Sequence, residues 1–383
     1  MVCLRRLITA AVVLALAAIG TAPALPGQAA ASYPLPVRTV SGTNYDTPDP
    51  GVLLYNGTFY GFSTDGGFRE WTAPEAAGPW TTPVDTLVHS TLPGWVDTTK
   101  GIWGPHMIQA TSGTFVVYFS AALKGTAGNP PGSDARPASG ARCIGTASSP
   151  SPTGPFSVAP APLVCFSQYG AADTMAADPG NRVPGEGALA GQPTFVTING
   201  QRELFLVYKT QGDPGNGQVV TTRMVRLADA DGTTVLGDSH QLLYSSTGSF
   251  ADTIEVQALV QNGPWFILFV AHGNWDSCNY STEWFKSQHI WAWANNGGTT
   301  LLTSAGTGLC GPGDAVETAS EVAGQDRIFL ASWVQESNGV ISTTPFGTGT
   351  PQENVNAARV MYAAVLRFAS DGYTPIVGEY LGQ

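Results

Sequence analysis

The chain repeats one pattern of apolar and polar positions, in which two short apolar segments flank a two-residue turn. Residues 51–64 show it first, as GVLLYNGTFYGFST, with the turn at Asn56-Gly57. An Asn-Gly pair between β-forming residues predicts a hairpin, because both central residues of a type I′ turn need positive φ. The pattern recurs at residues 106–121, 193–209, 258–272 and 315–334, around Ser112-Gly113, Asn199-Gly200, Asn262-Gly263 and Ala323-Gly324.

The five copies predict a fold made of repeated sheet units. Almost no helical periodicity separates them, and one hairpin alone is marginally stable in water. Repeated sheets gain stability by packing face to face around an axis. We therefore predict an all-β, five-bladed β-propeller that forms a single domain over residues 32–383, with residues 359–377 as a closing hairpin. A β-sandwich is the alternative, but sandwiches lack this long-period self-similarity.

The first residues predict a secretory signal peptide over residues 1–31. Arg5 and Arg6 precede the apolar run LITAAVVLALAAIG, and small residues lead to a cleavage site after Ala30 or Ala31. The run is short and rich in alanine for a membrane span, so a membrane anchor is the weaker reading. We expect a secreted, extracellular protein with no membrane contact after cleavage.

The cysteine count agrees with export. Cys3 leaves with the signal peptide, and Cys143, Cys165, Cys278 and Cys310 remain. An even number of cysteines in an oxidising compartment predicts disulfides. Three pairings are possible, and we favour Cys143–Cys165 with Cys278–Cys310 because each closes a local loop.

Charge and aromatic content narrow the partners. Only 12% of the residues are charged, and the net charge of −11 becomes −13 when the two signal-peptide arginines are removed. An acidic surface repels phosphate backbones, so we expect no nucleic-acid partner. Neutral polymers remain open, and the ten tryptophans would suit flat sugar faces, although core packing accounts for most of them.

Acidic and aromatic residues stand directly ahead of the repeated strands. In a propeller the first strand of each blade lines the central channel, so these residues are expected to converge at one mouth of it. They are Asp49, Trp103 with Gly104, Gln192 (with Asp173, Asp178 and Glu186 upstream), Glu255 and Asp314.

Two carboxylates across a cleft are the equipment of glycoside hydrolysis, in which one donates a proton and the other stays ionised. Apolar neighbours such as Ile254 and Val256 would favour the protonated form of Glu255. The plainer alternative is that Asp49 makes an Asp-Pro turn and Glu255 ends a loop. Their matching repeat positions favour the catalytic interpretation.

These segments resemble the family 43 glycoside hydrolases, which are secreted five-bladed propellers that cleave arabinose- or xylose-containing glycans with inversion. The resemblance spans the mature chain. TPDPGVLLYNGTFYGFST is similar to the first-blade segment of the family and implies that Asp49 is the general base. IWGPHMIQATSGTFVVYFSA resembles the second-blade segment, and IEVQALVQNGPWFILFVAH resembles the fourth, which implies that Glu255 is the general acid.

Two blades depart from the family pattern. The family places an Ile-Asp-Pro ahead of the third blade, with an aspartate that orients the acid, whereas Gln192 precedes the proline here. We prefer Asp173 as that aspartate, with Asp178 next; if Gln192 replaces it, activity would be low or absent. In the fifth blade Gly313-Asp314 stands where the family often has a metal-associated histidine, so we carry over no metal or other cofactor. Structural calcium has no supporting ligand spacing.

The leading hypothesis is an inverting glycosidase that acts as a monomer on a carbohydrate substrate, with Trp103, His106 and Trp275 in contact with sugar. The alternatives are a catalytically impaired glycan-binding propeller, motivated by Gln192 and Asp314, and a propeller used for protein interaction. The sequence leaves open which pentoside is cleaved and whether cleavage is terminal or internal.

Overall fold

The hairpins that the sequence predicts form the inner pair of strands of each sheet. In the computed structural model Asn56 and Gly57 have φ of 48° and 75°, and Asn199 and Gly200 have 52° and 78°. Both pairs thus have the positive φ that a type I′ turn requires. The turn predicted at Ala323-Gly324 lies outside the residues that the structure describes.

The described residues are 33–64, 67–97, 99–124, 142–165, 185–212, 220–245, 253–319, 325–352 and 355–382. All of them belong to one compact unit, residues 33–383. The predicted signal peptide lies outside them. In this part of the chain, the structure contains no helix with the length and apolar character that a bilayer crossing would require.

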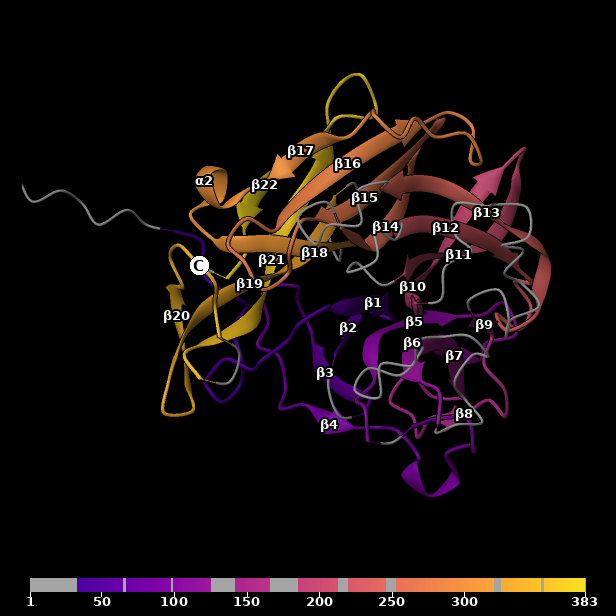
Figure 1. Ribbon diagram of the computed structural model, residues 1–383, viewed down its shortest axis with the longest axis horizontal. Helices are drawn as coiled ribbons and strands as arrows, with labels where there is room; N and C mark the ends of the chain where they lie inside the picture. Colours follow the sequence, from indigo (N-terminus) through magenta and orange to yellow (C-terminus); the bar gives the residue numbers. More distant parts are fainter. Residues whose placement is uncertain are drawn as a thin grey trace, which may run out of the picture. The chain divides into compact units, whose positions relative to one another are not determined.

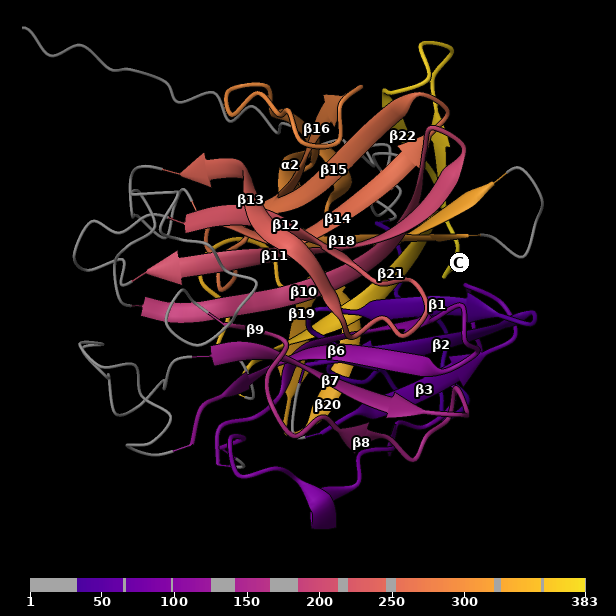
Figure 2. The same cartoon turned by 90° about the vertical axis from the view of Figure 1, so that its right-hand side faces the viewer.

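The strands form five antiparallel blades in sequence order. Blade 1 contains β1 (Gly51–Tyr55), β2 (Thr58–Ser63), β3 (Arg69–Ala73) and β4 (Val84–Asp85). Blade 2 contains β5 (Trp103–Gln109), β6 (Phe115–Ala122) and β7 (Arg142–Ser149), with β8 (Ser157–Val158) and β9 (Val164–Cys165) paired to β7. Blade 3 contains β10 (Gly185–Ile198), β11 (Gln201–Gly212), β12 (Val220–Leu227) and β13 (Val235–Ser245), which lie side by side in Figure 2.

Blade 4 contains β14 (Ile254–Asn262), β15 (Trp265–His272), β16 (Ser281–Ser287) and β17 (Thr299–Leu302). Blade 5 contains β18 (Cys310–Ala319), β19 (Asp326–Ser337), β21 (Ala357–Phe368) and β22 (Pro375–Tyr380), with β20 (Val340–Pro345) paired to β19. Among the described residues, the short helices are η1 (His89–Thr91) and α2 (Ser304–Thr307). One parallel pairing, Gly187 with Arg142, joins blade 3 to blade 2.

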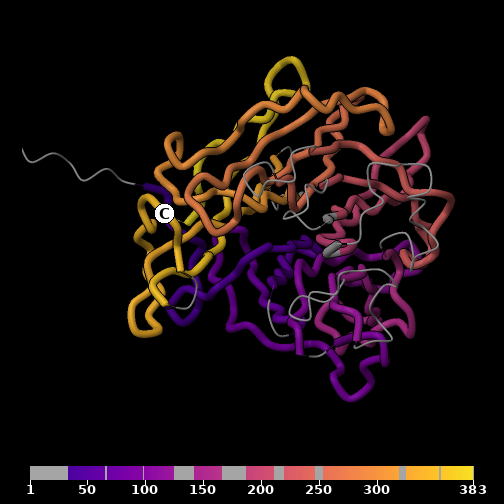
Figure 3. The backbone as a smooth tube through the Cα atoms, viewed as in Figure 1, coloured from indigo at the N-terminus to yellow at the C-terminus, as the bar shows by residue number. Residues whose placement is uncertain are grey.

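The first strands of the blades contact one another in a cycle: β1 with β5, β5 with β10, β10 with β14, β14 with β18, and β18 with β1. In Figure 1 these strands lie around the middle of the unit, and the outer strands β4, β13 and β17 lie toward its periphery. The colour in Figure 3 advances around the unit from indigo to yellow, so the blades follow in sequence order. The architecture is the predicted five-bladed β-propeller.

The hydrophobic core is divided among the interfaces between successive blades. One buried cluster lies between each neighbouring pair, including the pair formed by the last blade and the first. At this closing interface Phe329 of β19 lies with its ring centroid 5.8 Å from that of Phe59 and 6.1 Å from that of Trp80. The ends of the ring are therefore joined by aromatic packing between residues far apart in sequence.

Backbone hydrogen bonds also join the two ends. The segment ahead of β1 runs along β21, where the N–H of Val37 donates to the carbonyl of Met361 at 3.0 Å. The N–H of Thr47 donates to the carbonyl of Arg359 at 2.6 Å. The same segment then enters β1, so this pairing fixes the position of the residues just ahead of it.

Both favoured disulfides are present. Cys143 on β7 is bonded to Cys165 on the paired strand β9. Cys278, ahead of β16, is bonded to Cys310 at the start of β18. The second bond therefore links blade 4 to blade 5 near the point where both first strands begin.

Truncating Phe329 to alanine is expected to lower the free energy of unfolding by about 3–5 kcal/mol, because a buried phenylalanine leaves a cavity. Phe329 is fully buried at the closing interface. Urea denaturation followed by tryptophan fluorescence measures the change. The control is Val340→Ala in the same blade, where the side chain is 64% exposed and the change should stay within about 0.5 kcal/mol. Equal effects of the two substitutions would contradict the role of this interface.

Glu70 gives the fold a pH dependence. The side chain is 4% exposed, and burial raises the pKa of its carboxyl group to about 8, with a smaller opposing effect of a hydrogen bond from Thr86. Above pH 4.5, the ordinary value, the unfolded chain loses this proton while the folded chain keeps it. Its contribution to stability is therefore fully present below pH 4.5 and is lost as the pH rises through about 8.

Replacing the acid by its amide, Glu70→Gln, is expected to flatten the fall in unfolding free energy between pH 5 and pH 8 by roughly 3–5 kcal/mol. Urea midpoints at several pH values provide the measurement. Glu75→Gln is the matched control, because the Glu75 side chain is 63% exposed. A wild-type profile that keeps its slope in Glu70→Gln would show that another group is responsible.

Candidate active site

Each blade begins with one residue in the left-handed backbone region. These residues are Asp49 (φ 52°), Gly104 (50°), Ala190 (51°), Val256 (39°) and Asp314 (55°). In blades 2 to 5 this residue lies within a break in the strand register, and the regular pairing resumes two residues later. In blade 1 the pairing likewise starts two residues after Asp49, at Gly51 with Phe62. The five positions are therefore structurally equivalent.

These bulges re-aim the chain where each first strand begins. A bulge bends its strand and turns a side chain out of the pleat. Positive φ is uncommon outside glycine, asparagine and aspartate and is a genuine outlier for a β-branched residue such as Val256. Backbone strain of this kind costs on the order of 1–3 kcal/mol and gathers at functional sites.

A cavity of about 410 Å³ opens at the same place. Most of its lining comes from the left-handed positions of blades 1 to 4 and the residues just before them. The lining residues are Pro48, Asp49, Thr64, Trp103, Gly104, Ser120, Leu189, Ala190, Lys209, Glu255, Val256, Trp275 and Arg359. Asp49 and Glu255, the two carboxylates predicted from the sequence, thus face one cavity from different blades.

Asp49 is held by two donors. Thr64 Oγ1 donates to Asp49 Oδ2 at 2.5 Å, and the same hydroxyl oxygen accepts the backbone N–H of Gly104 at 2.8 Å. Arg359 Nη1 lies 3.5 Å from Asp49 Oδ1. Because Thr64 is itself fixed by blade 2, the Asp49 carboxylate has a defined orientation against the cavity.

Glu255 is also held through both oxygens. The ammonium group of Lys209, on β11 of blade 3, forms an ion pair with Glu255 Oε1. The hydroxyl of Tyr280, just ahead of β16, lies 3.2 Å from Glu255 Oε2. The Lys209 side chain is 3% exposed and that of Glu255 18% exposed, and both residues line the cavity.

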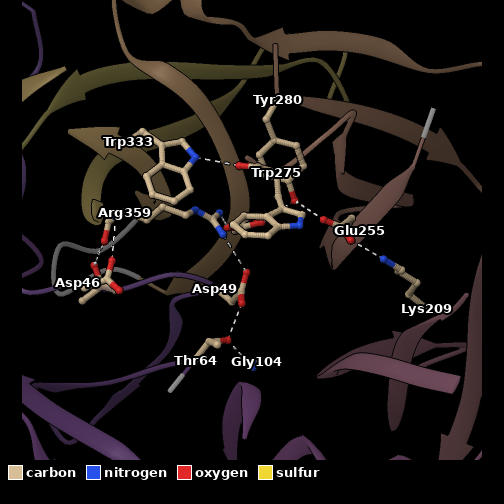
Figure 4. A network of polar contacts seen from close by, with 12 residues as sticks. Asp46, Asp49, Thr64, Gly104, Lys209, Glu255, Trp275, Tyr280, Trp333 and Arg359 are labelled. Atoms are coloured by element: carbon tan, nitrogen blue, oxygen red, sulfur yellow. Dashed lines mark hydrogen bonds and ion pairs between the residues drawn. The ribbon is translucent and has the colours of Figure 1, made fainter. Parts of the chain in front are cut away.

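Buried polar groups connect the two carboxylates. The Tyr280 hydroxyl donates to Asp314 Oδ1 at 2.7 Å, and the other oxygen of Asp314 pairs with Arg359 Nη2. Arg359 in turn reaches Asp49, as Figure 4 shows. Burial raises the pKa of the Tyr280 hydroxyl well above its usual range, and the nearby Glu255 carboxylate adds to the effect. Tyr280 therefore stays neutral and carries one proton.

Gly313 makes room for the Tyr280 ring. A Cβ at this position would lie 2.2 Å from Tyr280 Cε1. No side chain fits at that distance, so the glycine ahead of Asp314 allows the tyrosine to reach both carboxylates.

Two indole rings line the cavity and remain partly exposed. Trp103 and Trp275 are each 39% exposed. The guanidinium of Arg142 lies 3.2 Å from the centre of the Trp103 ring, and Trp275 stacks on Trp333 at 6.1 Å between centroids. Trp333 Nε1 also donates to the Trp275 carbonyl at 2.8 Å. Both indoles thus line the cavity and are held in place by neighbouring side chains.

Other predicted site residues lie elsewhere. His106 is 4% exposed and does not line the cavity, and burial lowers the pKa of its imidazole to about 4 despite the neighbouring Asp49 carboxylate. Its placement leaves no face for a sugar. Gln192 is buried two residues beyond the left-handed position of blade 3, which Ala190 occupies. Asp173 and Asp178 lie outside the described residues.

Lys209, Tyr280 and Arg359 are functional candidates that the sequence analysis missed. The available signal was polarity in an apolar setting: Arg359 stands in AARVMYAAV and Lys209 in LFLVYKT. A cation inside a buried strand must be paired, which in a chain so poor in charge points to a carboxylate site.

No protein-family model matches the sequence, and no curated protein matches it either. Solved structures do match. A thermostable family-43 glycoside hydrolase is similar over 91% of this chain and 96% of its own, with a TM-score of 0.64 and 18% identity. The Cellvibrio cellulosa α-L-arabinanase complexed with arabinohexaose is similar over 88% of this chain and 96% of its own, with a TM-score of 0.57 and 15% identity.

An endo-1,4-β-xylanase from Bacteroides thetaiotaomicron gives 89% and 97% coverage, a TM-score of 0.58 and 16% identity. At these identities the similarity concerns the fold, and it confirms the resemblance drawn from the sequence segments. The chain has the five-bladed β-propeller fold of the family-43 glycoside hydrolases.

Proposed function

We propose that this protein is a secreted, inverting glycoside hydrolase that acts on arabinose- or xylose-containing glycans, with Asp49 as general base and Glu255 as general acid. One observation carries the proposal: the two carboxylates face one cavity from blades 1 and 4, and two partly exposed indole faces line the same cavity. A pair of carboxyl groups at one cavity is what glycoside hydrolysis uses, and the indole side chains add surfaces on which a sugar ring can lie.

In this mechanism Asp49 takes a proton from a water molecule whose oxygen forms a bond to the anomeric carbon. The glycosidic bond breaks, its electron pair stays on the leaving oxygen, and Glu255 supplies the proton to that oxygen. An inverting enzyme needs about 6.5–9.5 Å between the two carboxyl groups to leave room for the water. The contacts from Thr64 and Arg359 suit Asp49 to its role, because both are donors to an acceptor carboxylate.

Two features support a sugar polymer as substrate: the indole side chains that line the cavity and the similar solved structures. Indole faces bind sugar rings through apolar contact, and Trp103 and Trp275 are the proposed sugar-contacting residues. The similar structures include an arabinanase and a xylanase, one of them complexed with arabinohexaose, which supports a pentose polymer as substrate. Two disulfides support an oxidising compartment and hence secretion.

A second candidate is a glycan-binding propeller without catalysis. It is favoured by Ala190, which puts a methyl group at the blade 3 position equivalent to Asp49, and by the ion pair of Lys209 with Glu255. A binding protein would keep the indole walls and hold its carboxylates as hydrogen-bond acceptors for sugar hydroxyls.

The purified protein is expected to release reducing sugar from arabinan, arabinoxylan or an aryl pentoside, and proton NMR should show a product of inverted anomeric configuration. Asp49→Asn and Glu255→Gln are each expected to lower kcat/KM on the polymer by about 100- to 10,000-fold, because each removes one proton-transfer group. Glu255→Gln also leaves the buried Lys209 without its anionic partner, so its folding is checked by circular dichroism and its activity is assayed well below its melting temperature.

The matched controls are Asp238→Asn and Glu379→Gln, whose side chains are exposed outside the cavity. Retained turnover in Glu255→Gln would remove Glu255 from the mechanism. Binding of the oligosaccharide without any turnover would instead support the glycan-binding candidate.

A further inference from the structure

We infer that Tyr280 is a positioning residue for the general acid, because its hydroxyl, oriented by Asp314, holds Glu255 Oε2 as the oxygen that carries the transferable proton. The inference rests on the proposed function and adds to it two residues, from blades 4 and 5. The third carboxylate near the two proposed catalytic groups is then Asp314, in blade 5.

The hydroxyl of Tyr280 has one hydrogen to donate, and two carboxyl groups lie within reach of it. Tyr280 faces two carboxylates, with its hydroxyl oxygen 2.7 Å from Asp314 Oδ1 and 3.2 Å from Glu255 Oε2. A phenol donates one hydrogen and accepts through its lone pairs. The shorter contact is the stronger hydrogen bond, so Tyr280 donates its hydrogen to Asp314. A lone pair of the hydroxyl oxygen is then left to accept a hydrogen bond from Glu255.

Asp314 is fixed in the role of acceptor. It is fully buried, and its second oxygen pairs with Arg359, which has only donors. A buried arginine keeps its charge, so a carboxylate beside it is the matching partner. Asp314 consequently has no proton to offer Tyr280.

Lys209 completes the arrangement from the other side. An ammonium group can only donate, and it occupies Glu255 Oε1. With a donor on Oε1 and an acceptor opposite Oε2, the hydrogen bond between Tyr280 and Glu255 forms when Oε2 carries the proton. That proton is then given to the leaving oxygen of the substrate, and the carboxylate that forms is stabilised by its ion pair with the Lys209 ammonium group.

The charged and titratable groups around Glu255 come from five elements. They are Lys209 on β11, Tyr280 ahead of β16, Asp314 on β18, Arg359 on β21 and Asp49 ahead of β1. At the corresponding left-handed position of blade 3 the chain has Ala190, which bears no charge. Blade 5 supplies Asp314 at that position instead, and it reaches Glu255 through Tyr280.

The test compares two substrates that differ in their need for acid catalysis. A 4-nitrophenyl pentoside has a leaving group that departs without protonation, whereas the phenyl pentoside needs a proton from Glu255. Tyr280→Phe is expected to lower kcat/KM about 10- to 100-fold on the phenyl substrate, within the range that general acid catalysis supplies. The loss on the 4-nitrophenyl substrate should be under about 3-fold. The alkaline limb of the phenyl pH profile should move to lower pH.

Tyr118→Phe is the matched control. Tyr118 is equally buried and its hydroxyl donates one hydrogen bond, to the carbonyl of Gly232 at 2.5 Å, outside the cavity. This variant should lose stability without changing the ratio of the two kcat/KM values. In a Glu255→Gln background, Tyr280→Phe should have no further effect on the phenyl substrate.

Equal losses on both substrates, or no loss on either, would overturn the inference. If Tyr280→Phe does not fold, 3-fluorotyrosine at position 280 is assayed in the same way, because it keeps the ring and the hydroxyl but weakens the hydroxyl as an acceptor, and it must show a selective loss on the phenyl substrate for the inference to stand. A wild-type protein inactive on every glycoside contradicts the proposed function itself, and the inference falls with it. Activity in the wild type with an unselective loss in the variant contradicts the inference alone.

Discussion

Arg359 links the closure of the propeller to the cavity, through its backbone on one side and its ion pairs with Asp49 and Asp314 on the other. Arg359 lies on β21 of the last blade, and its backbone N–H donates to Asp46 Oδ1 at 2.8 Å while its carbonyl accepts from Thr47. The backbone of one residue thus pins the segment that leads into β1, and its side chain reaches Asp49 and Asp314. Removing one partner of a buried ion pair costs about 3–5 kcal/mol. Removing the Arg359 side chain would also take one of the two donors from Asp49, leaving Thr64.

The few charged residues of this chain include a set of paired charges at the cavity. Buried charges are expensive unless they are paired and hydrogen-bonded. The cavity contains two cations and two carboxylates, and each cation is paired with a carboxylate from another blade. The blades are therefore joined by apolar clusters around the ring and by matched charges near its axis.

The sequence predicted the fold well because the signals are local. Asn56-Gly57 and the equivalent turns indicate hairpins from only a few neighbouring residues. The fivefold recurrence of the hairpin then predicts five blades. Asp49 and Glu255, which both line the cavity, could be picked out as candidates for the same reason, since each stands at the start of a recognisable strand. The alignment of blade 3 from the sequence was wrong, because Gln192-Pro193 resembles the Asp49-Pro50 of blade 1. In the structure the bulge places Ala190, two residues earlier, at the position equivalent to Asp49.

Lys209 and Tyr280 were out of reach for a different reason. Lys209 lies on a second strand and Tyr280 ahead of a third, and their contacts with Glu255 arise only when neighbouring blades pack. Periodicity within one blade carries no information on such contacts. The sequence shows only that a lysine sits among apolar residues, not which acid it meets.

The left-handed residue at the start of every blade has a consequence for how such a site can change. The backbone has the same conformation in all five places, and the positions of blades 1 to 4 line the cavity. A single substitution at one of those four can therefore add or remove a functional group at the cavity without a change of the backbone. Aspartate tolerates the left-handed conformation better than valine or alanine does. Ala190 and Val256 therefore stand at backbone positions where an aspartate would be less strained. The ring therefore has several equivalent backbone positions, and an acid can be placed at one blade or another without a change in the course of the chain.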